Sequence, residues 1–270
     1  MLDSVYDAIS PEPYFSGALS STYRDKVVLV AGASKGIGYS IALFYARAGA
    51  TVVIVSRFQD TLDEAKSDCS PSAEVLALAA DVTDPKAIQA VVAESMEKYG
   101  HLDVAIANAA IGGSWDQRFT DGDPYEDWWR VYALPYLEKT GGSFVAVSSL
   151  ACQASLPFAS AYSVSKSALN RLVEYTAMEY PRVKSFTIHP GRIVTKAPKP
   201  RAGPPPKWEP PAADTLELPA ATLLKLTDGS GKFDFLSGRF LSANWDLEEV
   251  ERDWKNEIVE KDMLLTRLVI

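Results

Sequence analysis

The chain has 270 residues, 47% apolar and 23% charged, which is ordinary globular usage and excludes a fibrous or wholly disordered protein. A formal charge of -8 argues against nucleic acid as a partner, because phosphates would repel such a surface. The two cysteines and two histidines lie far apart, so no metal site or disulfide framework is expected. The opening residues lack the basic, apolar pattern of a leader, and no stretch approaches the ~20 apolar residues of a membrane span, which predicts a cytoplasmic protein without a membrane partner.

Short apolar runs alternate with helical stretches after a polar, turn-rich N-terminal arm at residues 1–25. Strands are expected over residues 26–32, 51–57, 74–82, 102–108, 142–149, 183–191 and 238–245. Helices are expected over residues 37–50, 60–68, 85–100, 161–180 and 214–227, with Asp84 and Asp214 as caps of two of them. This alternation predicts a single α/β domain over residues 26–270, with a Rossmann-type doubly wound parallel sheet.

A glycine-rich turn follows the first predicted strand, in the segment AGASKGIG at residues 31–38. Glycines let the backbone approach a pyrophosphate, and the helix that follows offers free N–H groups and the positive end of its dipole. A glycine turn without a ligand is the alternative, but the position after the first strand favours a phosphate cradle. The residues expected to bind the cofactor here are Gly32, Ser34, Lys35, Gly36, Ile37 and Gly38.

The second predicted strand ends in VSR, residues 55–57, without the acidic residue that binds the ribose 2'-hydroxyl of NAD. Ser56 and Arg57 suit a 2'-phosphate, and Lys35 adds a second cation. We therefore expect NADP(H), with NAD(H) the less favoured cofactor. The alternative is that both cations are ordinary surface charges.

Tyr162 and Lys166, in the segment AYSVSK, lie four residues apart and so share one face of the predicted helix. Taken alone, the pair is typical of a solvated helix face. Together with the glycine turn and the segment HPGRIVT at residues 189–195, it resembles the short-chain dehydrogenase/reductase family over nearly the whole chain. The N-terminal arm and the charged C-terminal tail resemble a fungal-type branch of the family, many of whose members modify small secondary metabolites, and Arg57 and Lys35 predict an NADP-preferring member.

The resemblance implies that Tyr162 is the general acid or base, and that Lys166 holds the nicotinamide ribose and lowers the tyrosine pKa. An unperturbed tyrosine titrates near 10, so proton exchange near pH 7 requires a pKa lower by roughly 3. The family serine falls on Ser149, with Ser148 as the fallback. The resemblance adds cofactor contacts at Asp81, Val82, Asn108, Pro190, Gly191, Ile193 and Thr195. A helix cap is the alternative role for Asp81, and a loop hydroxyl is the alternative for Thr195.

The sequence departs from the family most between the fourth and fifth strands. About a dozen or more residues of the usual helix are missing between Ala133 and Leu134, which is about 18 Å of helix at ~1.5 Å per residue. The asparagine of the family's proton relay is missing with them. We expect a shortened helix and exposed apolar strand surface. Either this lineage has a shortened helix, or a coding segment was skipped when the sequence was derived.

The leading interpretation is an oxidoreductase that moves a hydride between NADP(H) and a small carbonyl or alcohol. A proline-rich segment at residues 196–213 is expected to be a substrate lid, or alternatively a surface loop. A homo-oligomer is possible. The alternative function is a catalytically impaired NADP(H)-binding pseudo-enzyme or scaffold.

Overall fold

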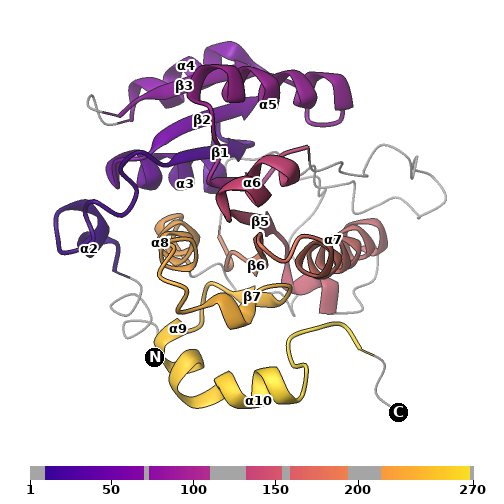
Figure 1. The fold of residues 1–270 in the computed structure, drawn as a ribbon. Coiled ribbons are helices and arrows are strands. Elements are labelled where there is room, and N and C mark those ends of the chain that lie inside the picture. The colour runs from indigo at the N-terminus through magenta and orange to yellow at the C-terminus, as the bar shows by residue number, and fades with distance from the viewer. Residues whose placement is uncertain (1–9, 70–72, 110–131, 154–158, 194–213, 268–270) are drawn as a thin grey trace.

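The computed structural model describes residues 10–69, 73–109, 132–153, 159–193 and 214–267 (Figure 1). Its seven strands form one parallel sheet in the order β3-β2-β1-β4-β5-β6-β7. The strands are β1 Val27–Ala31, β2 Thr51–Ser56, β3 Val75–Ala79, β4 Val104–Ala107, β5 Ser143–Val147, β6 Lys184–His189 and β7 Phe240–Ser242. All seven predicted strands are present, and the doubly wound parallel sheet is confirmed.

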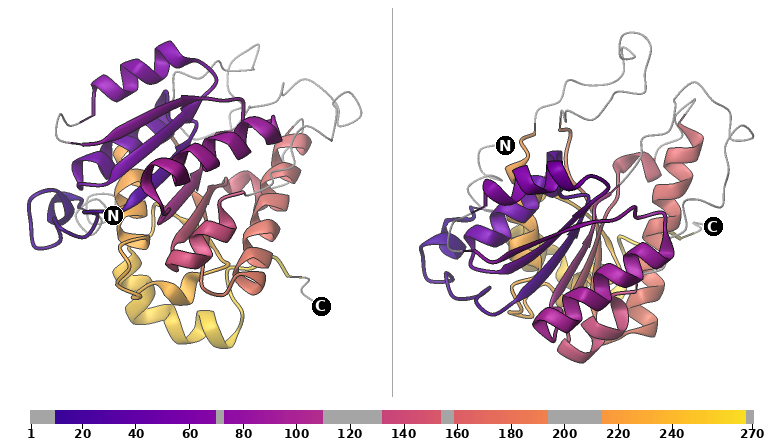
Figure 2. Two further views of the ribbon diagram at one scale, coloured as in Figure 1. Left: turned by 45° about the horizontal axis from the view of Figure 1, so that its top comes forward. Right: turned by 90° about the horizontal axis from the view of Figure 1, so that it is seen from above.

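Helices cover both faces of the sheet (Figure 2). The α-helices are α2 Glu12–Phe15, α3 Gly36–Arg47, α4 Gln59–Ser67, α5 Pro85–Tyr99, α6 Leu134–Thr140, α7 Ser160–Glu179, α8 Glu217–Leu226, α9 Leu247–Glu249 and α10 Lys255–Glu260. Helices α3, α4 and α8 share one apolar core, and α5, α6 and α7 share the other. Successive strand residues point to opposite faces, so Val28 and Val30 belong to the first core and Val27 and Leu29 to the second. Burial on both faces explains why the central strand β1 consists of apolar residues alone.

Two predicted helix starts have different outcomes. Asp84 caps α5 as predicted, because its carboxylate accepts the N–H of Lys86, and the helix ends at Gly100 with φ 79°. The prediction that Asp214 caps the helix expected over residues 214–227 is wrong. Helix α8 begins at Glu217 with no side-chain cap, and the Asp214 carboxylate is bound elsewhere.

Among the described residues between β4 and β5, the shortened helix is α6, whose seven residues include no asparagine, and residues 110–131 lie outside the described ranges. The expectation that it exposes apolar strand surface is wrong for the neighbouring strands. β5 is buried along its whole length, and β4 is buried from Val104 to Ile106. Leu134 and Leu137 of α6 pack into the same core as the strand residues, a core to which α5 and α7 also contribute.

The described part of the N-terminal arm packs against α3 and α8. The hydroxyl of Tyr23 is 2.5 Å from the carbonyl of Leu224, to which it donates, and 2.9 Å from Oγ1 of Thr227. Tyr45 of α3 contacts the same threonine at 2.7 Å, and its ring meets the Tyr23 ring edge-on at 5.1 Å. Hydrogen bonds and apolar contacts therefore hold the arm to the first core.

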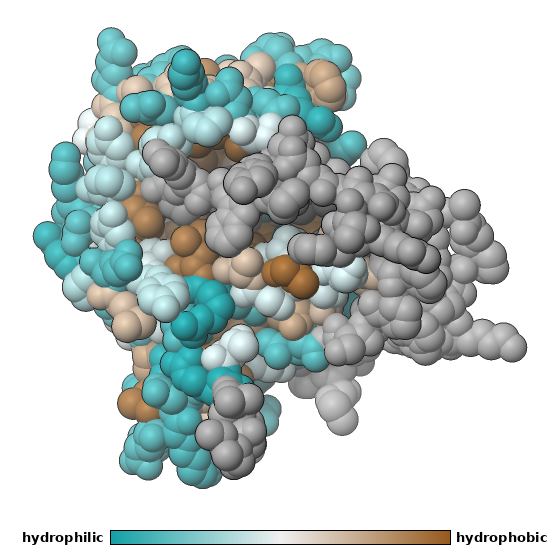
Figure 3. All heavy atoms as spheres, turned by 90° about the vertical axis from the view of Figure 1, so that its right-hand side faces the viewer, coloured by the Kyte–Doolittle hydropathy of each residue, from teal (hydrophilic) through white to brown (hydrophobic). Residues whose placement is uncertain are grey.

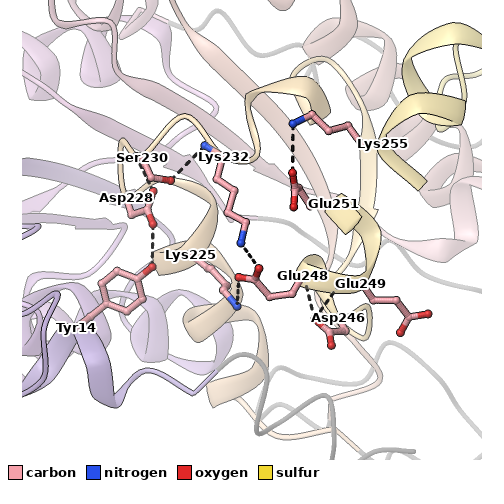
Figure 4. A network of polar contacts seen from close by, with 10 residues as sticks. All are labelled: Tyr14, Lys225, Asp228, Ser230, Lys232, Asp246, Glu248, Glu249, Glu251 and Lys255. Carbon is pink, nitrogen blue, oxygen red and sulfur yellow. Dashed lines mark hydrogen bonds and ion pairs between the residues drawn. The ribbon is translucent and has the colours of Figure 1, made fainter. Parts of the chain in front are cut away.

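A polar network joins this arm to the C-terminal helices (Figure 4). Tyr14 donates a hydrogen bond to Asp228, just beyond α8. Lys225 and Lys232 both form ion pairs with Glu248 of α9, at 2.9 Å for Lys225. Glu248 thereby ties α9 to α8 and to the turn that follows it. No helix in the described ranges is long and apolar enough to cross a bilayer.

Candidate functional site

The carboxyl ends of parallel strands share one edge of the sheet, and ligands bind beyond that edge in such folds. The predicted site residues follow the ends of six strands: Gly32 after β1, Arg57 after β2, Asp81 after β3, Asn108 after β4, Ser149 after β5 and Pro190 after β6. The fold therefore brings residues from distant parts of the sequence to one edge. Thr195 and the predicted lid at residues 196–213 lie outside the described residues.

The glycine turn has no room for side chains at two positions. A Cβ on Gly38 would lie 2.2 Å from the carbonyl oxygen of Gly32 and 2.4 Å from Nδ2 of Asn108. Gly32 has φ 81°, and a Cβ there would meet the backbone of Ala109 at 2.8 Å. Asn108 donates to the Gly32 carbonyl at 3.1 Å, so β4 supports the turn at the end of β1.

The start of α3 completes this cradle. Lys35 is at the N-cap position and forms no side-chain cap, and Gly36 has φ 62°. Ser34 and Ile37 are half-buried beside Lys35, whose side chain is exposed. Close backbone approach and an uncapped helix N-terminus fit a pyrophosphate, so the residues present suit a dinucleotide cofactor.

The predicted 2'-phosphate residues lie at the end of β2. Arg57 is exposed and lies with its guanidinium 5.5 Å from the centre of the Phe58 ring. Neither Arg57 nor Lys35 forms an ion pair with another described residue. Both cations are therefore accessible to an anionic ligand.

Asp81 follows β3 at the same edge, and Val82 beside it is half-buried. The Asp81 carboxylate accepts the N–H of Thr83 at 2.9 Å and its hydroxyl at 2.8 Å. These hydrogen bonds, together with the nearby Arg57 charge, hold the pKa of Asp81 below its usual value. Asp81 thus stays ionised and holds its own turn, and the helix cap is the neighbouring Asp84.

The tyrosine and lysine lie together near the start of α7. Lys166 is 8% exposed, and its Nζ lies 5.7 Å from the centre of the Tyr162 ring and donates to the carbonyl of Val147 at 2.8 Å. Burial lowers the pKa of Lys166 to about 8, an effect that the nearby Cys152 partly offsets. The lysine thus joins the tyrosine to the end of β5, next to the predicted catalytic serine.

The two serines after β5 have different environments. Ser148 is 2% exposed, and its hydroxyl donates to Oδ1 of Asn170 at 2.7 Å. Ser149 is half-buried, and its Oγ accepts the N–H of Ala151 at 3.2 Å. Because that bond uses a lone pair of Ser149, its hydroxyl proton is still available to a ligand. The geometry favours Ser149 over Ser148.

The turn after β6 is held by Asp214, a residue that the sequence predicts to be a helix cap. Pro190 and Gly191 are buried, Ile193 is half-buried, and Gly191 has φ 101°. Asp214 accepts the N–H of Arg192 at 2.6 Å, and the N–H of Asp214 donates to the carbonyl of Arg192 at 3.2 Å. These bonds join the two chain segments on either side of residues 194–213.

Sequence reasoning also missed two polar residues behind the site. Asn170 lies one turn beyond Lys166 and bonds to Ser148 and to Sγ of Cys152, the latter at 3.2 Å. His189, the last residue of β6, is 6% exposed and contacts the turn after Ser149. The i+4 spacing from Lys166 was a signal for Asn170. For His189 the signal was its place directly before the proline and glycine at a strand end.

Fold and site together define a dinucleotide-binding α/β protein of the dehydrogenase type. The family model described as short chain dehydrogenase matches residues 26–203. A short chain dehydrogenase of Monascus purpureus, mpl6, is 33% identical over 91% of this chain and 89% of its own length. Another from Emericella variicolor, andI, is 30% identical over 93% of this chain and 91% of its own. This chain belongs to the short-chain dehydrogenase/reductase family.

A third relative aligns with almost the whole chain. The short chain dehydrogenase pigC of Monascus ruber is 29% identical, with 99% of this chain and 92% of the relative covered. Its alignment runs over 293 positions against a chain of 270 residues, so at least 23 positions have no counterpart here.

Solved structures share the fold. A 7α-hydroxysteroid dehydrogenase complexed with NADH and 7-oxo glycochenodeoxycholic acid superposes with a TM-score of 0.68 at 22% identity, over 83% of this chain and 94% of that one. An alcohol dehydrogenase of Thermococcus sibiricus complexed with 5-hydroxy-NADP gives a TM-score of 0.65 at 26% identity, over 76% of this chain and 92% of that one. Both cofactor types thus occur among proteins of this fold.

Proposed function

We propose that this protein transfers a hydride between NADP(H) and a small carbonyl or alcohol, with Tyr162 as the general acid or base. The observation that carries the proposal is the buried Lys166, whose ammonium group lies between the Tyr162 ring and the end of β5. A buried lysine without an ion pair to a described carboxylate costs stability. Lys166 lies beside Tyr162 at the carboxyl ends of the strands, where its charge would assist proton transfer by the tyrosine, and this role accounts for the buried lysine.

The nicotinamide, when bound, supplies or accepts the hydride. In the reducing direction Tyr162 donates its hydroxyl proton to the substrate oxygen, and Ser149 donates a hydrogen bond to the same oxygen as negative charge develops. The Lys166 charge favours the ionised tyrosine that is left. Gly32, Gly36 and Gly38 admit the cofactor pyrophosphate to the backbone of the turn.

Removal of the Tyr162 hydroxyl tests this role. The variant Tyr162→Phe should lower kcat by about 10²- to 10⁴-fold, because the proton donor is lost. Its affinity for NADPH should change little. The control is Tyr175→Phe, which removes the hydroxyl of an exposed tyrosine on the same helix. Normal turnover in Tyr162→Phe, measured by NADPH absorbance with a panel of ketones, would refute the assignment.

The cofactor preference is tested at Arg57. A specific ligand raises the thermal midpoint of the folded state in a concentration-dependent way. NADPH should raise it more than NADH, and Arg57→Ala should weaken NADPH binding by about tenfold or more, since a charge-assisted hydrogen bond contributes ~1.5–3 kcal/mol. Arg24→Ala removes an equal charge just before the start of β1, at the opposite edge, and should leave the preference unchanged. Equal responses to NADPH and NADH in the unaltered protein would contradict the proposal.

The remaining parts of the proposal concern the substrate and the setting. The packed positions of Tyr162, Lys166 and Ser149 support catalysis over a cofactor-binding pseudo-enzyme or scaffold. The fungal origin of the relatives with most of their length aligned supports a substrate from secondary metabolism. Cytoplasmic location and a homo-oligomer stay predictions from the sequence.

A further inference from the structure

His189 has an interaction that fixes the state of its ring. Its Nδ1 lies 3.4 Å from the backbone nitrogen of Leu150, the residue after Ser149. A backbone N–H can only donate, so Nδ1 is the acceptor, and the neutral ring then carries its proton on Nε2. Burial lowers the pKa of His189 to about 4, while nearby Asp214 acts to raise it and Arg192 to lower it. The ring is therefore neutral near pH 7.

The other ring nitrogen shows that stability does not explain this histidine. Nε2 is buried and has no hydrogen-bond partner among the described residues. An unsatisfied buried donor costs about 1–3 kcal/mol, which an apolar residue of similar size would avoid. The bond to Leu150 is thus the polar interaction that accounts for histidine at the end of β6.

That bond completes a short chain of contacts around Ser149. The N–H of Ala151 donates to Ser149 Oγ, and the N–H of Cys152 donates to the Ser149 carbonyl at 3.1 Å. His189 binds the remaining N–H of the turn, that of Leu150. All three amides after Ser149 are therefore held, two of them by Ser149 and one by a residue from the neighbouring strand β6.

We propose that His189 is a positioning residue for Ser149: by accepting the Leu150 N–H it fixes the turn that aims the Ser149 hydroxyl at the substrate oxygen. This inference rests on the proposed role of Ser149. A displaced hydrogen-bond donor near the reacting atoms lowers the rate steeply, because catalysis depends on orientation.

Two substitutions separate the acceptor from the rest of the ring. In His189→Asn the side-chain oxygen occupies the position of Nδ1 and keeps an acceptor for Leu150, whereas His189→Leu fills the space without one. His189→Leu should lower kcat by about 10- to 100-fold with NADPH affinity unchanged, and His189→Asn should stay within a few-fold of the unaltered protein. Equal impairment of both variants overturns the proposal.

A double-mutant cycle tests whether His189 acts through Ser149. In a Ser149→Ala background, His189→Leu should lower kcat further by less than about twofold, because the group it positions is gone. A full, multiplicative loss in that background would mean that the substitution acts through general packing, and it would overturn the proposal. The thermal midpoint of every variant confirms that each is folded.

A second measurement does not depend on turnover. The chain has two histidines, so ¹⁵N spectra of labelled protein are assigned by the signal lost in the His189 variants. At pH 7 His189 should be neutral with its proton on Nε2, and the Leu150 amide should shift in His189→Leu far more than in His189→Asn. A proton on Nδ1 refutes the proposal even if the enzyme is active. If Ser149→Ala alone leaves kcat unchanged, the role assigned to Ser149 is refuted while these spectra still report on the Leu150 contact.

Discussion

Gly38 shows how a single residue sets the shape of the cofactor cradle. A methyl group there would lie 2.2 Å from the Gly32 carbonyl and 2.4 Å from the Asn108 amide, so the turn would have to open. Gly142, before β5 at the opposite edge of the sheet, is as crowded, with a Cβ 2.2 Å from the carbonyl of Asp103. Substitution by alanine at either glycine would therefore cause the same steric clash, at the carboxyl ends of the strands for Gly38 and at their amino ends for Gly142.

This pair yields a prediction at the residue scale. Gly38→Ala and Gly142→Ala should both lower the thermal midpoint, because each places an atom where backbone already lies. Only Gly38→Ala should also reduce, by at least half, the rise in midpoint that saturating NADPH gives. If Gly142→Ala reduces that rise equally, the effect comes from overall destabilisation and not from the cradle.

At the scale of elements, α7 is joined to the end of β5 by polar groups. Lys166 donates to Val147, Ser148 donates to Asn170, and Ser167 donates to the carbonyl of Cys152 at 3.1 Å. Helices usually pack on a sheet by apolar side chains, which α7 also does through Val173. The polar end of the contact lies at the predicted catalytic residues, which implies that function and not stability determines it.

Lys166→Met should therefore stabilise the protein while it abolishes turnover. The folded-state pKa of Lys166 is lowered from 10.5 to about 8, so its charged form costs ~3 kcal/mol below pH 8. Loss of the hydrogen bond to Val147 offsets ~1 kcal/mol, which leaves a gain of ~2 kcal/mol at pH 7.

The pH dependence follows from the sign of this shift. Between pH 8 and 10.5 the unfolded lysine binds more protons than the folded one, so the unaltered protein gains stability as pH rises and the advantage of Lys166→Met shrinks. Urea unfolding at pH 7 and pH 9.5 measures both. The exposed Lys86→Met is the control and should change little. A Lys166→Met protein less stable than the unaltered one at pH 7 would contradict the argument.

At the scale of the whole molecule, residues 10–25 of the N-terminal arm are part of the folded unit. Tyr23 and Leu224 are 201 residues apart in sequence and yet form a buried hydrogen bond. Figure 3 shows the face that carries α7, where apolar residues lie between hydrophilic ones. Val164, Tyr175 and Met178 of α7 are exposed, which is compatible with the homo-oligomer predicted from the sequence.

Tyr23→Phe measures how strongly the arm is attached. It removes the buried hydroxyl that donates to the Leu224 carbonyl, while Thr227 keeps Tyr45 and the Leu223 carbonyl as partners, so we expect a loss of about 1–2 kcal/mol. In a chain of this size that lowers the thermal midpoint by roughly 2–6 °C. Tyr175→Phe, at an exposed position, should lower it by much less. An unchanged midpoint in Tyr23→Phe would mean that the arm contributes nothing to stability.

The sequence by itself determined the seven strands and their parallel arrangement, the glycine turn at Gly32 and the Tyr162–Lys166 pair. These are local patterns, since an apolar run between turns makes a buried strand and two residues four apart share a helix face. Only the tertiary structure decided that Asp214 holds the turn at Arg192, that α6 packs into one core with α5 and α7, and that His189 binds the amide after Ser149. Each of these joins segments far apart in the chain, and such contacts depend on how strands align and helices pack, which no local pattern records.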